Sequence, residues 1–243
     1  ESCRWLVAQG LVVGSAGNVG VRVDANHIVV SAGGVLYEHL EAGDHPVVNL
    51  HDQSWEGPLK PTSELPLHTM LFRELPELNV VVHTHSKAAA AFAVARRELD
   101  FICNENIGVR AERILVTDYA VPSSHELGTH CLHTLRRQPG SRACLLANHG
   151  VVALGDTAEA ARVLAAQVEW IAEIMFRAEI IGEPHVLSAE TAARVCAAYG
   201  VEMARESADE PTMPRAAHEL IERHGLRPLP IDGGWYRQTS RSD

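Results

Sequence analysis

The sequence predicts an α/β protein built as a three-layer α/β/α sandwich, in which helices cover both faces of a central mixed, largely antiparallel sheet. Short β-branched apolar runs alternate with longer segments of helical spacing along the chain. Consecutive strands are joined by tight polar breaks, such as Asn148-His149-Gly150, which suit antiparallel neighbours. The interleaving of the two kinds of element therefore favours layers over a bundle or a barrel.

In the first half of the chain, segments with helical spacing alternate with β-branched runs that are typical of strands. A helical run ends before Gly10, and two β-branched runs flank Asp24-Ala25-Asn26, a pattern typical of a hairpin. Ser63 is placed to cap a helix that tolerates Pro66 because proline falls in the first turn. The expected elements are a helix over Ser2–Gln9, strands over Val19–Val23, His27–Val30 and Val47–Leu50, and a helix from Ser63 to about Leu75.

The second half contains the longest apolar segments. An apolar strand ends in histidines and is followed by a helix dominated by alanine. Gly150 separates two buried strands, and Gly200 follows the helix that is expected to end at Ala198. The expected elements are strands over Leu78–His83, Ile114–Val116, Ala143–Ala147 and Val151–Leu154, and helices over Ser86–Arg96, Ser124–Arg137, Thr157–Ile181 and Ala189–Ala198.

Residues 1–200 are expected to form one domain and residues 201–243 a C-terminal tail. No stretch before residue 200 has the composition of a linker, whereas the last forty residues are rich in proline, arginine and acidic side chains. Arg215–Arg223 is the one segment of the tail with helical character.

Composition narrows the class of partner and the compartment. The formal net charge of -10 repels nucleic acid and anionic membranes, so we expect neither as a partner. No run approaches the ~20 apolar residues that span a bilayer. The 5 cysteines are scattered and never form a C-x-x-C pair, which favours free thiols in a reducing compartment, the cytoplasm.

Three histidines lie where apolar strands end. His83 and His85 are separated by one residue, and alternate side chains on a strand share a face, roughly 6–7 Å apart. His149 follows another buried strand. Three neutral imidazoles with one open position are typical of a catalytic metal site. An H-x-H pair alone is a weak signal, because a polar strand end produces the same pattern.

Further segments surround these histidines in a fixed order. They are Gly14-Ser15-Ala16-Gly17-Asn18-Val19, Ser31-Ala32-Gly33-Gly34-Val35-Leu36-Tyr37, Lys60-Pro61-Thr62-Ser63-Glu64, Val82-His83-Thr84-His85, Asp118-Tyr119-Ala120 and Ala147-Asn148-His149-Gly150. Together they resemble the class II aldolase/adducin family over about Leu6 to Gly200.

The resemblance implies a site for each function. His83, His85 and His149 would bind Zn²⁺, although Mn²⁺, Co²⁺ or Fe²⁺ also suits such ligands, and Glu64 would act as the base. Tyr199 would donate a proton in a neighbouring subunit's site, in a homotetramer with sites at its interfaces. The residues placed in the family's phosphate pocket are Gly17, Asn18, Gly34, Thr62 and Ser63, which match its pattern, and Gly33, which departs from it.

The implied activity is that of a divalent-metal-dependent aldolase, a lyase that cleaves a small ketose or ketose phosphate through a metal-stabilised enediolate. Two departures keep other activities open. Gly20 and Gly33 stand where the family has hydroxyl residues, and Ile102–Asn106 lacks the family's other tyrosine. A metal-dependent decarboxylase, dehydratase or 4-epimerase on the same scaffold is therefore the alternative, acting on a different sugar or oxo acid with or without a phosphate. A non-catalytic adducin-like module is a remote one.

Overall fold

The computed structural model describes residues 1–204, 227–228 and 235–236. The chain divides into two compact units, Glu1–Glu206 and Ser207–Asp243. In the second unit, β10 (Arg227–Pro228) pairs antiparallel with β11 (Trp235–Tyr236). The helix expected over Arg215–Arg223 lies outside the described residues. The division into a domain of residues 1–200 and a tail of 201–243 stays a prediction.

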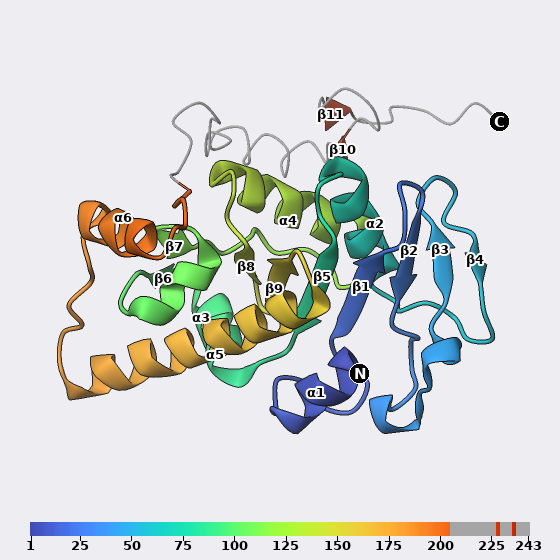
Figure 1. Cartoon of the computed structure of the whole chain (residues 1–243), viewed down its shortest axis with the longest axis horizontal. Coiled ribbons are helices and arrows are strands. Elements are labelled where there is room, and N and C mark those ends of the chain that lie inside the picture. Colours follow the sequence, from blue (N-terminus) through green and yellow to red (C-terminus); the bar gives the residue numbers. More distant parts are fainter. Residues whose placement is uncertain (205–226, 229–234, 237–243) are drawn as a thin grey trace. The chain divides into compact units, whose positions relative to one another are not determined.

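A seven-stranded sheet in the order β4-β3-β2-β1-β5-β9-β8 forms the middle of the first unit (Figure 1). Every neighbouring pair in this sheet is antiparallel. A parallel bridge between Val116 and Leu145 adds a mixed edge beyond β8. The predicted mixed, largely antiparallel sheet is confirmed. The strands are β1 (Asn18–Arg22), β2 (His27–Val30), β3 (Val47–Asn49), β4 (Trp55–Glu56), β5 (Val80–Thr84), β8 (Ala143–Leu146) and β9 (Gly150–Gly155).

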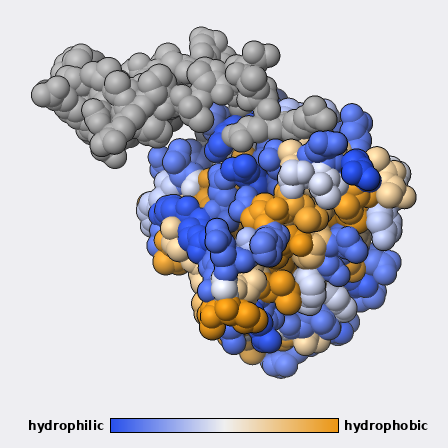
Figure 2. Space-filling view, turned by 90° about the vertical axis from the view of Figure 1, so that its left-hand side faces the viewer, coloured by the Kyte–Doolittle hydropathy of each residue, from blue (hydrophilic) through white to orange (hydrophobic). Residues whose placement is uncertain are grey.

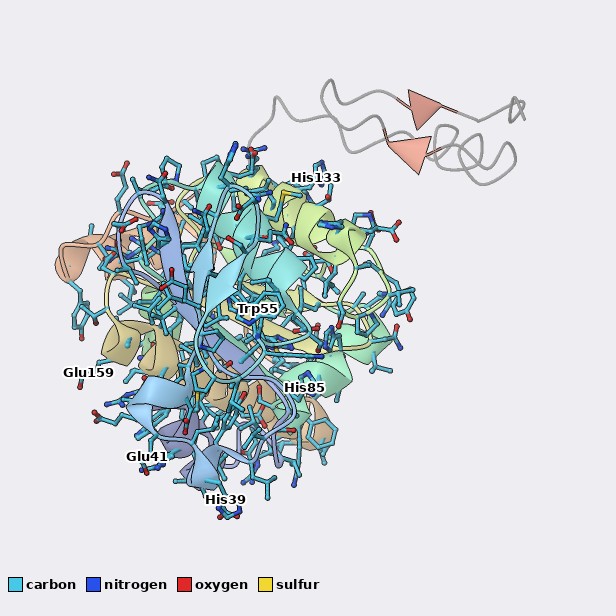
Figure 3. All side chains as sticks on the ribbon, turned by 90° about the vertical axis from the view of Figure 1, so that its right-hand side faces the viewer. His39, Glu41, Trp55, His85, His133 and Glu159 are labelled. Atoms are coloured by element: carbon cyan, nitrogen blue, oxygen red, sulfur yellow. The ribbon has the colours of Figure 1, made fainter. Side chains whose placement is uncertain are left out.

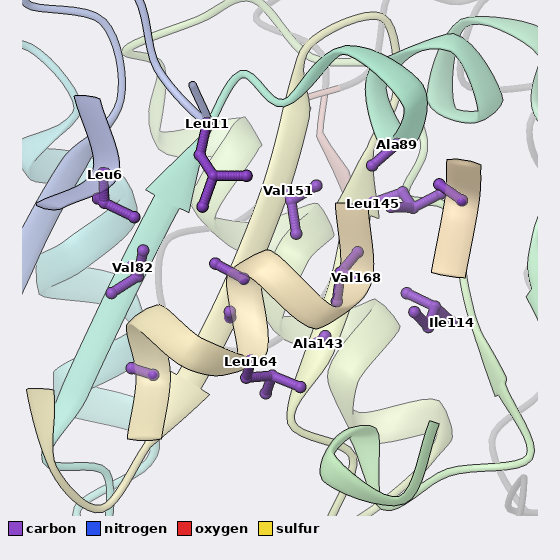
Figure 4. Close-up of a cluster of buried hydrophobic side chains, with 14 of the residues drawn as sticks. Leu6, Leu11, Val82, Ala89, Ile114, Ala143, Leu145, Val151, Leu164 and Val168 are labelled. Carbon is purple, nitrogen blue, oxygen red and sulfur yellow. The ribbon is translucent and has the colours of Figure 1, made fainter. Parts of the chain in front are cut away.

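Helices cover both faces of this sheet, as expected for three layers (Figure 1). One apolar cluster joins a face of the sheet to α2 and α4, and a second joins the other face to α1, α3 and α5. Figure 4 shows the second cluster, where Leu164 and Val168 of α5 meet Val82, Val151 and Leu145 of the sheet. The helices are α1 (Ser2–Ala8), α2 (Leu65–Glu74), α3 (Lys87–Ala95), α4 (His125–Arg137), α5 (Ala158–Ile181) and α6 (Ala189–Ala198).

Strand alternation decides which face each residue of β5 meets. Val80 and Val82 pack in the α5 cluster, whereas Val81 packs in the α2 cluster. His83 therefore lies on the same face as Val81, towards α2. Its register partners are Asn18 at the start of β1 and Val152 near the start of β9. The functional segments consequently meet at one end of three adjacent strands.

Some short elements differ from the expectations. Ser63 does not cap α2: the helix begins at Leu65 with Glu64 as its N-cap, and no side chain caps it. β4 and β6 (Leu99–Asp100) were not expected, because two-residue strands leave no periodic signal. β6 pairs with β7 (Arg113–Ile114), which overlaps the strand expected over Ile114–Val116. The remaining short elements are the 3-10 helices Tyr37–His39, Ala42–Asp44 and Asn104–Val109.

All five cysteines are free thiols, as their scattered spacing predicts. Cys131 of α4 and Cys144 of β8 lie with their sulfur atoms 3.5 Å apart in the apolar cluster. In the described part of the chain, none of the helices combines the length and apolar character that a membrane span requires.

Candidate metal centre

His83 is fixed in the core by its backbone and by its ring. It is the second-last residue of β5 and has no exposed surface, and its Nδ1–H donates to the carbonyl oxygen of Val151 at 2.9 Å. A carbonyl can only accept, so in the neutral ring the proton is on Nδ1 and the lone pair is on Nε2. An imidazole held in this way is oriented as a metal ligand is.

The other two histidines turn their rings towards the same point. The Nε2 atoms of His83 and His85 lie 2.9 Å apart, and the ring centroids of the three histidines are 4.7–4.9 Å apart. One ring nitrogen from each of His83, His85 and His149 lies within 4.8 Å of the others. Ligand atoms at ~2.1 Å around one tetrahedral ion are separated by about 3.4 Å. The three nitrogens thus fit one ion.

His85 reaches this cluster from beyond the strand rather than from within it. β5 ends at Thr84, and the His85 backbone N–H donates to the carbonyl oxygen of Leu11 at 3.2 Å. α3 begins two residues later, and His85 is half-buried between the two elements (labelled in Figure 3). The loop before β1 therefore sets the position of His85, which simple strand alternation did not predict.

The histidines are in the protonation state that a metal requires. Burial lowers the pKa of His83 to about 3 and also lowers the pKa of His85. Both rings are therefore neutral at neutral pH, with lone pairs available. Converging lone pairs repel one another unless a cation lies between them, so the chemistry of this donor set fits a divalent metal.

Glu64 lies directly against the histidine cluster. Its Oε2 is 3.1 Å from Nε2 of His83 and its Oε1 is 3.3 Å from Nε2 of His149. Burial raises the pKa of this carboxyl, but the nearby rings of His83 and His149 and a hydrogen bond from Asn18 lower it further, and the net pKa lies below its usual value. Glu64 is thus a buried carboxylate at neutral pH, within reach of both an ion and its substrate.

The residues expected to bind phosphate lie around this cluster and differ in their exposure and in how tightly their neighbours pack. Ser63 and Gly34 are exposed, and Gly34 has a φ of 76°. Thr62 is buried, and its hydroxyl accepts a hydrogen bond from the Glu64 backbone N–H at 3.3 Å. Gly17 is pressed against β5, since a Cβ there would lie 2.6 Å from the carbonyl oxygen of His83.

Gly33 has no room for the hydroxyl that the resemblance would place there. Its backbone N–H donates to Lys60, and the Thr62 N–H donates to Ser31, so the two loops are joined. A Cβ on Gly33 would lie 2.9 Å from the carbonyl oxygen of Pro61. The glycine is therefore a packing requirement of this chain.

Tyr199 lies apart from the cluster within this chain. It follows α6 as the C-cap, and 66% of its surface is exposed. α6 contributes to a separate small core with Phe101, Ala192 and Cys196. Any role in chemistry would therefore have to be played towards another subunit.

One buried polar residue at the site was not predicted. His68 of α2 has no exposed surface, and its Nε2 is 2.6 Å from the side-chain oxygen of Asn18. Its signal in the sequence is a histidine four residues after Glu64, which places both on one side of a helical turn. That spacing gains meaning only once β1 lies against α2.

The comparisons with known proteins agree with this geometry. Residues 1–176 match the family model described as the class II aldolase and adducin N-terminal domain. The chain belongs to the class II aldolase and adducin family.

Characterised members of this family resemble the chain over most of its length. A 5-methylthioribulose-1-phosphate/5-deoxyribulose-1-phosphate aldolase of Rhodospirillum rubrum is 32% identical over 195 residues, which cover 80% of this chain and 86% of the relative. The L-fuculose phosphate aldolase of Escherichia coli is 30% identical over 196 residues, which cover 80% of this chain and 89% of the relative. The prediction of a lyase of the class II aldolase type is confirmed by these relatives.

Solved structures of the family give the same fold. An L-fuculose 1-phosphate aldolase superposes with a TM-score of 0.76 at 26% identity, covering 82% of this chain and 92% of that one. YgbL of Klebsiella pneumoniae, described as a putative aldolase/epimerase/decarboxylase, reaches 0.70 at 24% identity over 80% of this chain and 93% of its own, and shows the fold alone. The relatives do not favour the decarboxylase, dehydratase, epimerase or adducin-like alternatives.

Proposed function

We propose that this class II aldolase cleaves a short-chain ketose 1-phosphate into dihydroxyacetone phosphate and an aldehyde. The observation that carries the proposal is the convergence of three imidazoles on one point, with the Glu64 carboxylate 3.1 Å and 3.3 Å from two of them. The names of the relatives, a methylthioribulose or deoxyribulose phosphate aldolase and a fuculose phosphate aldolase, indicate the substrate class.

We assign the metal position to His83, His85 and His149, with Zn²⁺ as the expected ion. Zn²⁺ commonly takes three imidazoles and leaves a position open, although Mn²⁺, Co²⁺ or Fe²⁺ also suits these ligands. The bound ion would supply positive charge that stabilises negative charge on the substrate's carbonyl and hydroxyl oxygens.

Glu64 is the proposed base. In the condensation direction its carboxylate takes a proton from the hydroxymethyl carbon of dihydroxyacetone phosphate, and that carbon bonds to the aldehyde carbon. The aldehyde oxygen then gains a proton and becomes a hydroxyl; cleavage is the reverse. The phosphate would lie against Gly17, Gly34 and Ser63, with Thr62 and Gly33 shaping the loop beneath it.

Tyr199 is the proposed proton donor to the aldehyde oxygen, from a neighbouring subunit of a homotetramer. Its exposure and its position outside its own cluster support such a role. α5 also exposes Trp170, Phe176, Ile180 and Ile181. Figure 2, which faces the left-hand side of Figure 1, shows apolar side chains gathered on the surface of the first unit. Exposed apolar patches of this kind mark sites of association between protein chains. The free thiols and negative charge favour a cytoplasmic enzyme without nucleic acid or membrane partners.

The test combines metal analysis with product analysis. Protein purified without added metal should contain close to one divalent ion per chain. It should release dihydroxyacetone phosphate from ketose 1-phosphates of the ribulose and fuculose series, but not from the unphosphorylated sugars. His149→Ala should lose metal and activity together. His27→Ala removes a histidine from the far end of β2 and should change neither. Release of carbon dioxide from an oxo acid, without ketose cleavage, would replace the proposal.

A further inference from the structure

Asn18 is surrounded by polar partners that use both ends of its amide. Its Nδ2 donates to Oε2 of Glu64 at 3.1 Å, and its Oδ1 lies 2.6 Å from Nε2 of His68. All three side chains are buried, with exposed fractions of 0% for His68, 3% for Asn18 and 5% for Glu64. Asn18 therefore joins the base Glu64 to His68 through the two ends of its amide.

The direction of each hydrogen bond in this row is determined. A carboxylate accepts only, so the amide nitrogen of Asn18 faces Glu64 and the amide oxygen faces His68. An amide oxygen also accepts only, so Nε2 of His68 carries the proton. Burial lowers the pKa of His68 to about 4, which leaves the ring neutral and its Nδ1 without a proton. Nδ1 has no hydrogen-bond partner among the described residues.

Gly20 makes room for this histidine. A Cβ at Gly20 would lie 2.5 Å from Nδ1 of His68 and 3.0 Å from the Phe72 ring. Phe72 stacks on His68 from the next turn of α2, with ring centroids 6.4 Å apart. Gly20 thus leaves the space that the imidazole occupies, and the stacked Phe72 ring holds the imidazole in the orientation that reaches Asn18.

We propose that His68 is a positioning residue that acts through Asn18 on the base, Glu64. The proposal rests on the aldolase function proposed above, and it gives the side chain of Asn18 a role in holding Glu64. An unanchored amide can rotate by half a turn and present its oxygen to the carboxylate, which repels Glu64 from its place. The N–H of His68 prevents this rotation.

The first test separates positioning from metal binding. His68→Leu removes the donor, whereas His68→Gln places an amide N–H near the same point. We expect His68→Leu to keep its metal and its KM but to lose on the order of 10–100-fold in kcat, the range typical of outer partners of a metal site. His68→Gln should recover most of the loss. The control is Leu71→Val, a buried change on the same helix at a residue that takes part in none of the row's hydrogen bonds, and it should leave kcat unchanged.

The second test asks whether His68 acts through Asn18. If it does, adding His68→Leu to Asn18→Ala should lower kcat no further than Asn18→Ala alone. Losses that multiply, or a folded and metal-loaded His68→Leu enzyme that turns over like the wild type, would overturn the proposal.

A third readout does not depend on activity. In metal-free protein with ¹⁵N-labelled histidine, the nitrogen shifts of His68 should report a neutral ring protonated at Nε2, and Asn18→Ala should shift the Nε2 signal. A ring protonated at Nδ1 would overturn the inference even in an active enzyme. A wild type that cleaves no ketose phosphate, but has the expected His68 signals, would instead contradict the proposed function and leave the hydrogen-bonded row intact.

Discussion

Acid should destabilise the metal-free protein through His68. The unfolded chain binds a proton at this ring near pH 6.5, whereas burial lowers the pKa of the folded state to about 4. Below pH 6.5 the unfolded state therefore binds more protons than the folded state. The stability that His68 provides as a neutral ring is complete above pH 6.5 and is lost as the pH falls towards 4.

The size of the effect follows from the two pKa values. Between pH 6.5 and pH 5.0, one ring with a pKa of 6.5 when unfolded and about 4 when folded lowers the free energy of unfolding by about 1.6 kcal/mol. His83, whose folded pKa is about 3, contributes a similar loss over the same interval. Glutamine does not titrate, so His68→Gln should remove the first contribution and keep the second.

Urea unfolding in the presence of a chelator measures this difference. With an m value of about 2–3 kcal/mol per M, the wild type should lose roughly 0.5–0.8 M more in its midpoint than His68→Gln between pH 6.5 and pH 5.0. Any constant effect of the substitution cancels, because each protein is compared with itself at two pH values. Equal losses in the two proteins would refute the assignment of His68 as a buried neutral ring.

Two further substitutions test the base and the segment that follows the metal ligands. Glu64→Gln should keep the metal but lower turnover by ~10²-fold or more, because an amide cannot accept the proton. Metal analysis and the exchange of solvent deuterium into dihydroxyacetone phosphate check this. A variant that exchanges deuterium as fast as the wild type would refute it. Glu169→Gln should lower the free energy of unfolding by about 1–2 kcal/mol, because the carboxylate accepts from the backbone N–H groups of Ala88 and Ala89 at 2.9 Å each. The control Glu173→Gln alters an exposed pair and should change unfolding by less than about 0.5 kcal/mol, so equal effects of the two would contradict the capping role.

The proposed metal ligands could be named from the sequence because their signals are short-range. His83 belongs to an apolar strand and His149 to a tight turn between two strands, and both signals are local. The role of Asn18 was not predictable in this way. It depends on the register that sets Asn18 opposite His83 and on the packing of α2 over β1. That packing brings Asn18 to Glu64, forty-six positions away, and to His68, fifty positions away.

The exchange of hydroxyl residues for glycine illustrates the same limit. From sequence alone, Gly20 and Gly33 indicate a pocket that has lost two hydrogen-bond donors. In the structure both positions are filled by neighbours, His68 at Gly20 and the backbone of Pro61 at Gly33. A missing side chain is therefore ambiguous until the atoms around it are known.

This distinction can be tested at Gly33. If the pocket merely lacked a hydroxyl, Gly33→Thr would tighten phosphate binding. The structure predicts the reverse, because the new Cβ would meet the Pro61 carbonyl at 2.9 Å and Cα of Thr62 at 3.2 Å, in the segment that carries Glu64. Such overpacking costs about 1–3 kcal/mol.

The substitution should therefore lower the urea midpoint, weaken binding of the ketose phosphate and lower kcat, since Glu64 moves with the segment. Gly43→Ala is the matched control, because nothing lies within 4 Å of a Cβ at that position. A Gly33→Thr enzyme that unfolds like the wild type and binds phosphate more tightly would show that the two loops separate easily. The glycine would then be a lost ligand, and the phosphate pocket would have to be redrawn around it.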